Sequence, residues 1–217
     1  MTGKIKLVHS GGNSVSVAVP TNAPSASEVE FKLPQSDGSS GQALVTDASG
    51  NLSFASVAGG KILQVVQTVK TDTFSANHQS LVDVTGLSVS ITPSSSSNKV
   101  LVTYDLNISA ANGSYHVHVF LVKGSTKIYL GDAEGSRTRS SNYIMTTNDS
   151  TGHMQYYPLH GEFLDSPATT SATTYKIQVL GQNSSNNTLF VNRTNYNADD
   201  AGVNRTVSQI TAKEVAA

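Results

Sequence analysis

Strict alternation of apolar and polar residues dominates the stretch from Leu81 to Ala110 and limits what this chain can fold into. Leu87, Val89 and Ile91 alternate with Ser and Thr, and the alternation resumes after Pro93 and a run of serines. The later apolar residues are Val100, Val102, Tyr104, Leu106 and Ile108. A period of two places these side chains on one face of a strand, whereas a helix would scatter them around its circumference. The stretch therefore predicts an antiparallel pair of strands joined by a polar turn, with one face buried and one in water.

Similar alternation, interrupted by turn residues, continues to the C-terminal end of the chain. No amphipathic helical pattern separates these segments, which argues against a parallel α/β fold. Short strands with turn signals between them are typical of a β-sandwich or a jelly roll. We expect the first and last strands of this region to lie side by side. The predicted strands are 61–70, 80–84, 87–92, 98–109, 114–123, 126–130, 142–147, 154–163, 173–181, 187–193 and 204–215.

Residues 1–58 have a different character, because short apolar pieces alternate with Pro, Gly and Asp-Gly turn signals. Burying a Val or Phe side chain stabilises a fold by roughly 1.5–3 kcal/mol, while ordering the backbone of each residue costs about 1–2 kcal/mol. So few apolar side chains cannot fold this segment alone. We expect neighbouring chains to order it, as in a fibre shaft or a docking arm, the alternative being a flexible tether. Gly59-Gly60 is the predicted boundary, and residues 59–217 form the predicted β-sandwich head.

Composition excludes several classes of function. Charged residues make up 13% of the chain, against about 25% in an ordinary globular domain. The formal net charge is −1 and no basic cluster stands out, which argues against binding to nucleic acid. The absence of cysteine removes disulfides and thiolate metal sites. No apolar run approaches the ~20 residues of a membrane span, and the first residues lack the apolar centre of a signal peptide. We expect a chain made in the cytoplasm and not inserted into a membrane.

Four segments carry a resemblance to a known class of proteins. LSVSITPSSSSNKVLVTYDLNIS, with GKILQVVQTVKTDTF before it and TVSQITAKEVAA at the far end, resembles the C-terminal β-rich domain of tailed-phage fibres and other virion-surface proteins. LPQSDGSSGQALVTDASGNLSF is similar to a segment that recurs in phage fibre shafts. The resemblance implies a structural or adhesive protein of the virion surface that assembles as a homotrimer. It also implies an N-terminal arm or shaft that contacts other virion proteins.

Two other functions remain open at the sequence level. A capsid decoration or cement protein would use residues 1–58 as a docking arm, and its head would not bind the host. A polysaccharide-degrading tailspike would need a pair of catalytic carboxylates. Glu162 and Asp165 are the pair to consider, although the sequence shows neither a defined separation nor a raised pKa for either. We predict a non-enzymatic protein without a cofactor.

His116 and His118 are two residues apart on a predicted strand, so both imidazoles face the same side. Convergence of several copies on a threefold axis would gather nitrogen ligands of the kind that bind zinc or iron. Without a carboxylate or a thiolate close by, the preferred interpretation is a polar strand face. Asp132 with Glu134, and Asp199 with Asp200, do not follow the spacing of a calcium-binding loop and are interpreted as solvated charges.

Tyrosine rings are the best candidates for binding a receptor, because they offer an apolar face and a polar tip. The candidates are Tyr129, Tyr143, Tyr156, Tyr157, Tyr175 and Tyr196. Loops usually carry such sites. We therefore predict that a host-surface glycan or protein contacts the loops that bear Arg137, Arg139 and Tyr143, and Arg193 to Tyr196.

Overall fold

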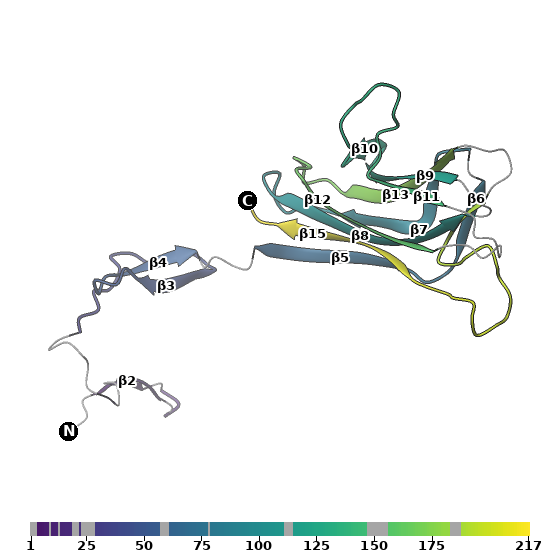
Figure 1. Ribbon diagram of the computed structural model, residues 1–217. Helices are drawn as coiled ribbons and strands as arrows, with labels where there is room; N and C mark the ends of the chain where they lie inside the picture. The colour runs from purple at the N-terminus through teal and green to yellow at the C-terminus, as the bar shows by residue number, and fades with distance from the viewer. Residues whose placement is uncertain are drawn as a thin grey trace. The chain divides into compact units, whose positions relative to one another are not determined.

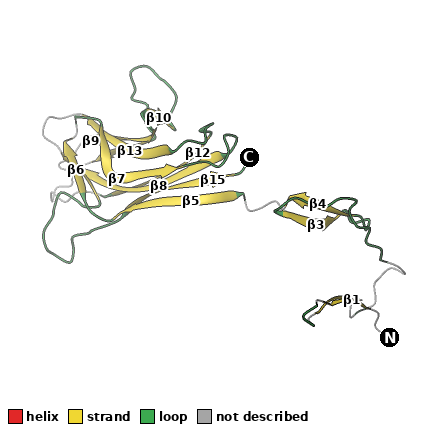
Figure 2. Cartoon of the chain, turned by 180° about the vertical axis from the view of Figure 1, so that it is seen from behind, coloured by secondary structure: helices red, strands yellow, loops and turns green. Residues whose placement is uncertain are grey.

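The computed structural model of the chain is all-β. It describes residues 4–8, 10–12, 14–18, 22, 29–56, 61–77, 79–110, 115–146, 156–182 and 188–217. Figure 2 shows strands and loops in this described part, and no helix. The chain divides into two compact units, Met1–Gly59 and Gly60–Ala217. Gly59 and Gly60, the expected boundary, lie outside the described residues. The role of the first unit as an attachment arm stays a prediction.

The second unit, the head, is built from two antiparallel sheets (Figure 1). One sheet contains β5 (Ile62–Lys70), β6 (Phe74–Asn77), β8 (Lys99–Ala110), β12 (Tyr157–Asp165), β14 (Thr188–Val191) and β15 (Ser208–Val215). The other contains β7 (Val82–Ile91), β9 (Tyr115–Lys123), β10 (Thr126–Ile128), β11 (Asn142–Thr146) and β13 (Thr173–Gln182).

The order of the strands is that of a jelly roll. β6 continues the line of β5, and β14 that of β15, so the first sheet reads β5/β6, β15/β14, β8, β12. The second sheet reads β7, β13, β9, and β10 and β11 then follow one after the other along the free edge of β9. Two such sheets placed face to face make the jelly-roll sandwich. The prediction of a jelly-roll-like head is therefore confirmed.

Alternation along the strands decides which side chains form the core between the sheets. Every second residue of β8 from Val100 to Ile108 is buried, as the sequence pattern predicts. The facing sheet contributes Leu87, Val89 and Ile91 from β7. Further core residues come from β9, β13, β14 and β15: Val117, Val119, Leu121, Tyr175, Ile177, Val179, Leu189, Val191, Ile210 and Ala212.

The predicted pairing of 87–92 with 98–109 is wrong. β7 pairs with β13, whereas β8 pairs with β12, β14 and β15 in the opposite sheet. The turn between them carries the chain from one sheet to the other. Both strands show the alternation of a half-buried strand because both face the same core, and alternation does not reveal the partner. The expected adjacency of the first and last strands is confirmed, since β15 pairs with β5 from Ser208 opposite Lys70 to Val215 opposite Ile62.

Two further features of the strands differ from expectation, besides shifts of a few residues at strand ends. The predicted strands 80–84 and 87–92 form one strand, β7, in which Gly86 has a φ of 81°. This left-handed residue shifts the buried positions from Val84 to Leu87, and the pairing with β13 is irregular at the same place. The strand β6 was not predicted, although Phe74 and Ala76 alternate with Ser75 and Asn77.

Asn192 lies where two strand lines of the first sheet are interrupted, between β5 and β6 and between β14 and β15. It has a left-handed φ of 62°, which asparagine tolerates better than most residues. Its side-chain nitrogen donates to the carbonyls of Lys70 (2.8 Å) and Asp72 (2.9 Å). Its side-chain oxygen accepts a hydrogen bond from Ser208 Oγ at 2.7 Å. One fully buried side chain thus satisfies two backbone carbonyls where β5 passes into β6 and binds the Ser208 hydroxyl at the start of β15.

The chain enters and leaves the head at the same end, which we call the proximal end. Ala216 N donates to Lys61 O at 2.7 Å. Beside this contact, the buried carboxylate of Glu214 accepts four hydrogen bonds, and these contacts form the Glu214 network. The donors are Ser94 N (2.6 Å), Ser94 Oγ (2.7 Å), Asn98 Nδ2 (2.6 Å) and Gln64 Nε2 (2.7 Å).

The first unit consists of hairpins. β1 (Lys4–Val8) pairs with β2 (Ser14–Ala18), and β3 (Gln42–Thr46) pairs with β4 (Leu52–Ser56). Two hydrogen bonds of 2.8 Å tie Lys32 to Gly50 and Leu52. Isolated two-stranded hairpins are marginal in water, and large apolar side chains of this unit are exposed. They are Leu7, Val8, Val29, Phe31, Leu33, Leu44, Val45 and Phe54.

Candidate functional site

The outward face of β9 carries His116 and His118, which confirms that both histidines point to the same side. The intervening Val117, like Val119, is buried in the core. Outward-facing Phe120 is nonetheless buried, and Lys127 Nζ lies 3.8 Å from the centroid of its ring. The positive charge of Lys127 therefore lies over the Phe120 ring, on the same face of β9 as the two histidines.

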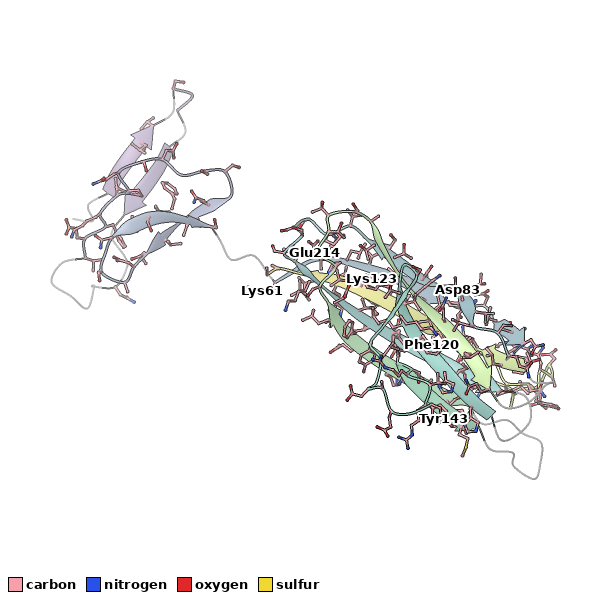
Figure 3. All side chains as sticks on the ribbon, turned by 90° about the horizontal axis from the view of Figure 1, so that it is seen from above. Lys61, Asp83, Phe120, Lys123, Tyr143 and Glu214 are labelled. Atoms are coloured by element: carbon pink, nitrogen blue, oxygen red, sulfur yellow. The ribbon has the colours of Figure 1, made fainter. Side chains whose placement is uncertain are left out.

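A depression of about 460 Å³ opens over these histidines, within the size range of ligand pockets. We call it the distal depression. Its lining comes from β9, β11, β13 and the loop 129–141: His116, His118, Ser136, Arg137, Thr138, Ser140, Tyr143 and Gln182. Figure 3 shows Tyr143 at the end of the head away from Lys61 and Glu214. The strand register agrees, because Gln182 lies opposite His116, whereas Tyr175 lies opposite Lys123 at the other end of β9.

Three rings form the floor of the distal depression. The centroids of the Tyr143 and His116 rings are 5.7 Å apart and the rings are stacked, while Tyr143 and His118 are 5.1 Å apart and tilted. The Tyr143 hydroxyl is hydrogen-bonded to His116 Nδ1. The Tyr143 side chain is 46% exposed, so it still offers surface to a ligand. The arrangement is an aromatic platform with polar edges.

The neighbours of Tyr143 hold it in place. Asn142 accepts a hydrogen bond from the Tyr104 hydroxyl and donates to His160 O at 3.2 Å, which ties β11 to the opposite sheet. Ser141 N donates to Val119 O at 2.9 Å, which fixes the start of β11 on β9. The platform therefore stands on a rigid strand and not on a free loop.

The loop 129–141 forms the rim of the distal depression. Arg139 Nε donates to Gly131 O at 2.6 Å and clamps the loop at its base. Arg137 lies on the lining, where its guanidinium is 3.8 Å from the Glu134 carboxylate and both side chains are largely exposed. An exposed pair of this kind contributes little and exchanges readily. Arg137 is thus available to a ligand, whereas Arg139 has a structural role.

His118 is the least exposed member of the lining, at 7%. Burial lowers its pKa, and the charges of His116 and Lys127 act in the same direction against a hydrogen bond to Gln182. His118 is therefore neutral at pH 7. Its Nδ1 atom lies 3.4 Å from Ser140 Oγ. No group of three His, Cys, Asp or Glu side chains that could hold a metal ion occurs among the described residues. The metal-binding alternative gains no support from this geometry.

The predicted binding residues separate in space. A second depression of about 370 Å³ is lined by Tyr156, Thr194, Tyr196, Asp200, Gly202, Val203 and Asn204. Arg193, predicted beside Tyr196, packs its guanidinium over the Phe190 ring at 4.2 Å. Arg137 and Tyr143 therefore share one surface, Tyr196 belongs to another, and Arg193 is engaged within the fold.

Most of the other tyrosines are packing residues. Tyr129 packs against Phe163 with ring centroids 5.5 Å apart. Tyr175 is fully buried, and its hydroxyl donates to Asp165 Oδ2 at 2.7 Å. The lining residues Ser136, Thr138, Ser140 and Gln182 were not predicted, because no local pattern distinguishes them from the many other polar residues.

Glu162 and Asp165 do not form a catalytic pair. The two residues are an odd number of positions apart on β12, and this places their side chains on opposite faces of the strand. Glu162 is therefore exposed, while Asp165 is buried in the sandwich. Lys123 Nζ contacts both carboxylate oxygens of Asp165, at 3.0 and 2.9 Å. Asp165 therefore joins the two sheets. Among the loop acids interpreted as solvated charges, Asp200 accepts a hydrogen bond from Gly202 N at 2.7 Å, which is a turn contact.

No protein-family model and no curated protein matches this chain. Similar solved structures come from infectious bursal disease virus. T=1 particles derived from this virus have 13% sequence identity and a TM-score of 0.38 over 80% of this chain and 40% of that chain. The Gx strain structure has 16% identity and a TM-score of 0.32 over 80% and 41%. The VP2 subviral particle has 13% identity and a TM-score of 0.30 over 79% and 42%.

The chain thus spans about two fifths of the length of these viral proteins. TM-scores below 0.5 at these identities do not establish a shared function. No helix in the described part of the chain is long and apolar enough to cross a membrane.

Proposed function

We propose that the chain is a non-enzymatic structural protein of a tailed-phage virion. In this proposal it is a short trimeric fibre or adhesin whose jelly-roll head attaches the virion surface to the host. Jelly rolls occur in viral capsids and in lectins, although a fold alone does not determine function. The supporting observation is that the two ends of the head differ. Lys61, the first described residue of the head, lies at the proximal end, while the distal depression with Tyr143 lies at the opposite end.

Attachment through the distal depression predicts a specific loss of binding. We expect Tyr143→Ala to reduce binding of the labelled full-length protein to host cells by about tenfold, because the platform loses its exposed ring. Flow cytometry would measure this effect. Tyr196→Ala, in the second depression, is the matched control and should bind as well as the wild type. Wild-type protein that does not bind host cells would contradict an attachment role, and equal binding of both variants would contradict this site.

The exposed apolar residues of the first unit support assembly. Phe31 is 63% exposed and Leu33 is 77% exposed, which is a poor arrangement for an isolated hairpin. Packing against the same unit of other copies would cover them and give the unit a core. Threefold assembly is proposed because the sequence resembles phage fibres.

We expect the full-length protein in solution to have three times the chain mass of 22.7 kDa. Multi-angle light scattering during size-exclusion chromatography would measure the mass. The double variant Phe31→Asp and Leu33→Asp should reduce the assembled fraction, since it places charge in the proposed contact. Leu164→Asp, at an exposed leucine on the head, is the control and should leave the mass unchanged. A monomeric wild type would exclude the homotrimer.

A capsid decoration protein is the second candidate. The exposed apolar residues of the first unit favour it equally, since they could pack against a capsid subunit instead of further copies of this chain. Immunogold labelling of intact virions separates the candidates. Label at the tail or on fibres supports the adhesin, and label distributed over the capsid shell supports decoration.

A further inference from the structure

The described lining of the distal depression carries a positively charged side chain that is available to a ligand. Among the described residues that line it, Arg137 is the one arginine or lysine, and none is a carboxylate. Glu134 lies outside the lining and contacts Arg137 at 3.8 Å from an exposed position. Such a contact is largely screened by water. A ligand carboxylate or phosphate that enters the depression can therefore replace Glu134 as the partner of Arg137 and accept two parallel hydrogen bonds from it.

The remaining groups suit a sugar ring. The exposed face of Tyr143, backed by the rings of His116 and His118, provides a flat apolar surface against which C–H groups can pack. Hydroxyls of Thr138 and Ser140 and the amide of Gln182 lie around this surface and can donate and accept hydrogen bonds. Gln182 Nε2 donates to Thr138 Oγ1 at 3.3 Å, so these groups are already oriented with respect to one another.

The binding groups are pre-ordered. His118 is buried and neutral, the loop is clamped by Arg139, and Tyr143 stands on a strand tied to the opposite sheet through Asn142. A rigid site loses less conformational entropy when a ligand binds than a flexible one. Arg137 is an exposed member of the lining, and its long side chain can adjust to a ligand.

From this combination of the Tyr143 platform, hydroxyl and amide groups and the Arg137 guanidinium, we propose that the distal depression binds an anionic saccharide. The sugar ring packs on Tyr143, and its acidic group pairs with Arg137. This inference rests on the proposed function in host attachment and names the class of ligand for that site. A carboxylate and a phosphate share the required chemistry.

The test is binding of the full-length protein to an array that carries paired glycans. Uronate-containing, sialylated and sugar-phosphate glycans are placed beside their neutral counterparts. We expect acidic members to bind at least about tenfold more tightly than their neutral pairs. Arg137→Ala should abolish this preference, and Arg137→Lys should restore part of it, because lysine keeps the charge but loses the planar fork. Arg205→Ala removes one charge from an exposed residue outside the lining and should bind as the wild type does.

A preference for carboxylated or for phosphorylated members identifies which acidic group is used, and either result supports the inference. Equal or better binding to neutral glycans, or no binding to any glycan, overturns it. Cell binding separates this failure from that of the proposed function. If Tyr143→Ala still lowers attachment to cells, attachment stands and the ligand is of another class. If the wild type does not attach to cells, the proposed function fails too.

Discussion

Replacing Glu214 with alanine is expected to lower the free energy of unfolding of the head by about 3 kcal/mol or more. Glu214 is 1% exposed, and its carboxylate is the common acceptor for Ser94, Asn98 and Gln64. Each hydrogen bond to a charged group contributes about 1.5–3 kcal/mol, and removal of the acceptor leaves buried donors without partners. Urea denaturation followed by circular dichroism measures the change. Glu162→Ala, at an exposed glutamate, is the matched control and should change stability by no more than about 0.5 kcal/mol.

The Glu214 network also predicts how stability depends on pH. Burial raises the pKa of Glu214, but the hydrogen bonds from Asn98, Ser94 and Gln64 outweigh this effect and hold the pKa at about 2, against 4.5 for the unperturbed group. Because the pKa of the folded state is the lower one, the contribution is fully present above pH 4.5 and is lost as the pH falls from 4.5 towards 2. The stability difference between wild type and Glu214→Gln should shrink over this interval. A difference that stays constant would contradict the assignment.

Replacing Gly161 with alanine is expected to destabilise the head by about 3 kcal/mol. Gly161 lies directly opposite Tyr104 across the β8–β12 pair. A Cβ atom at this position would lie closer than 3.0 Å to Cε1, Cζ and Oη of Tyr104. The ring cannot move aside easily, because it is fully buried and its hydroxyl is hydrogen-bonded to Asn142.

Gly131→Ala is the matched control for this substitution. A Cβ atom added at Gly131 would have no neighbouring atom within 4 Å, and Gly131 does not have the left-handed backbone that requires glycine. The free energy of unfolding of this variant should stay within about 0.5 kcal/mol of the wild-type value. Thermal and urea unfolding would measure both variants. Because Tyr104 supports Asn142, the residue before Tyr143, Gly161→Ala should also weaken binding at the distal depression. A Gly161→Ala protein as stable as the wild type would mean that the Tyr104 ring has room to move.

The candidate site could be predicted only in part from the sequence. Exposed loops and tyrosines often carry binding sites, which predicts Tyr143 and Arg137 as binding residues, and the two residues do share a depression. The same reasoning predicts Arg139, yet its guanidinium holds the loop together. The sequence around Gln182 contains nothing that distinguishes this residue. It reaches the depression because β13 pairs with β9 in a register that places it opposite His116.

An all-β head, and the buried face of most of its strands, could be predicted from the sequence alone. That information is local, since neighbouring residues of a strand point to opposite sides and apolar side chains must leave water. The pairing of the strands could not be predicted in this way and is seen in the folded structure. β7 and β8 follow one another and look like a hairpin, but they lie in opposite sheets and present their apolar faces to the same core from its two sides. Pairing joins residues far apart in the chain, and many partners satisfy the same alternation. The distal depression depends on that pairing, since it forms where β9, β11 and β13 meet.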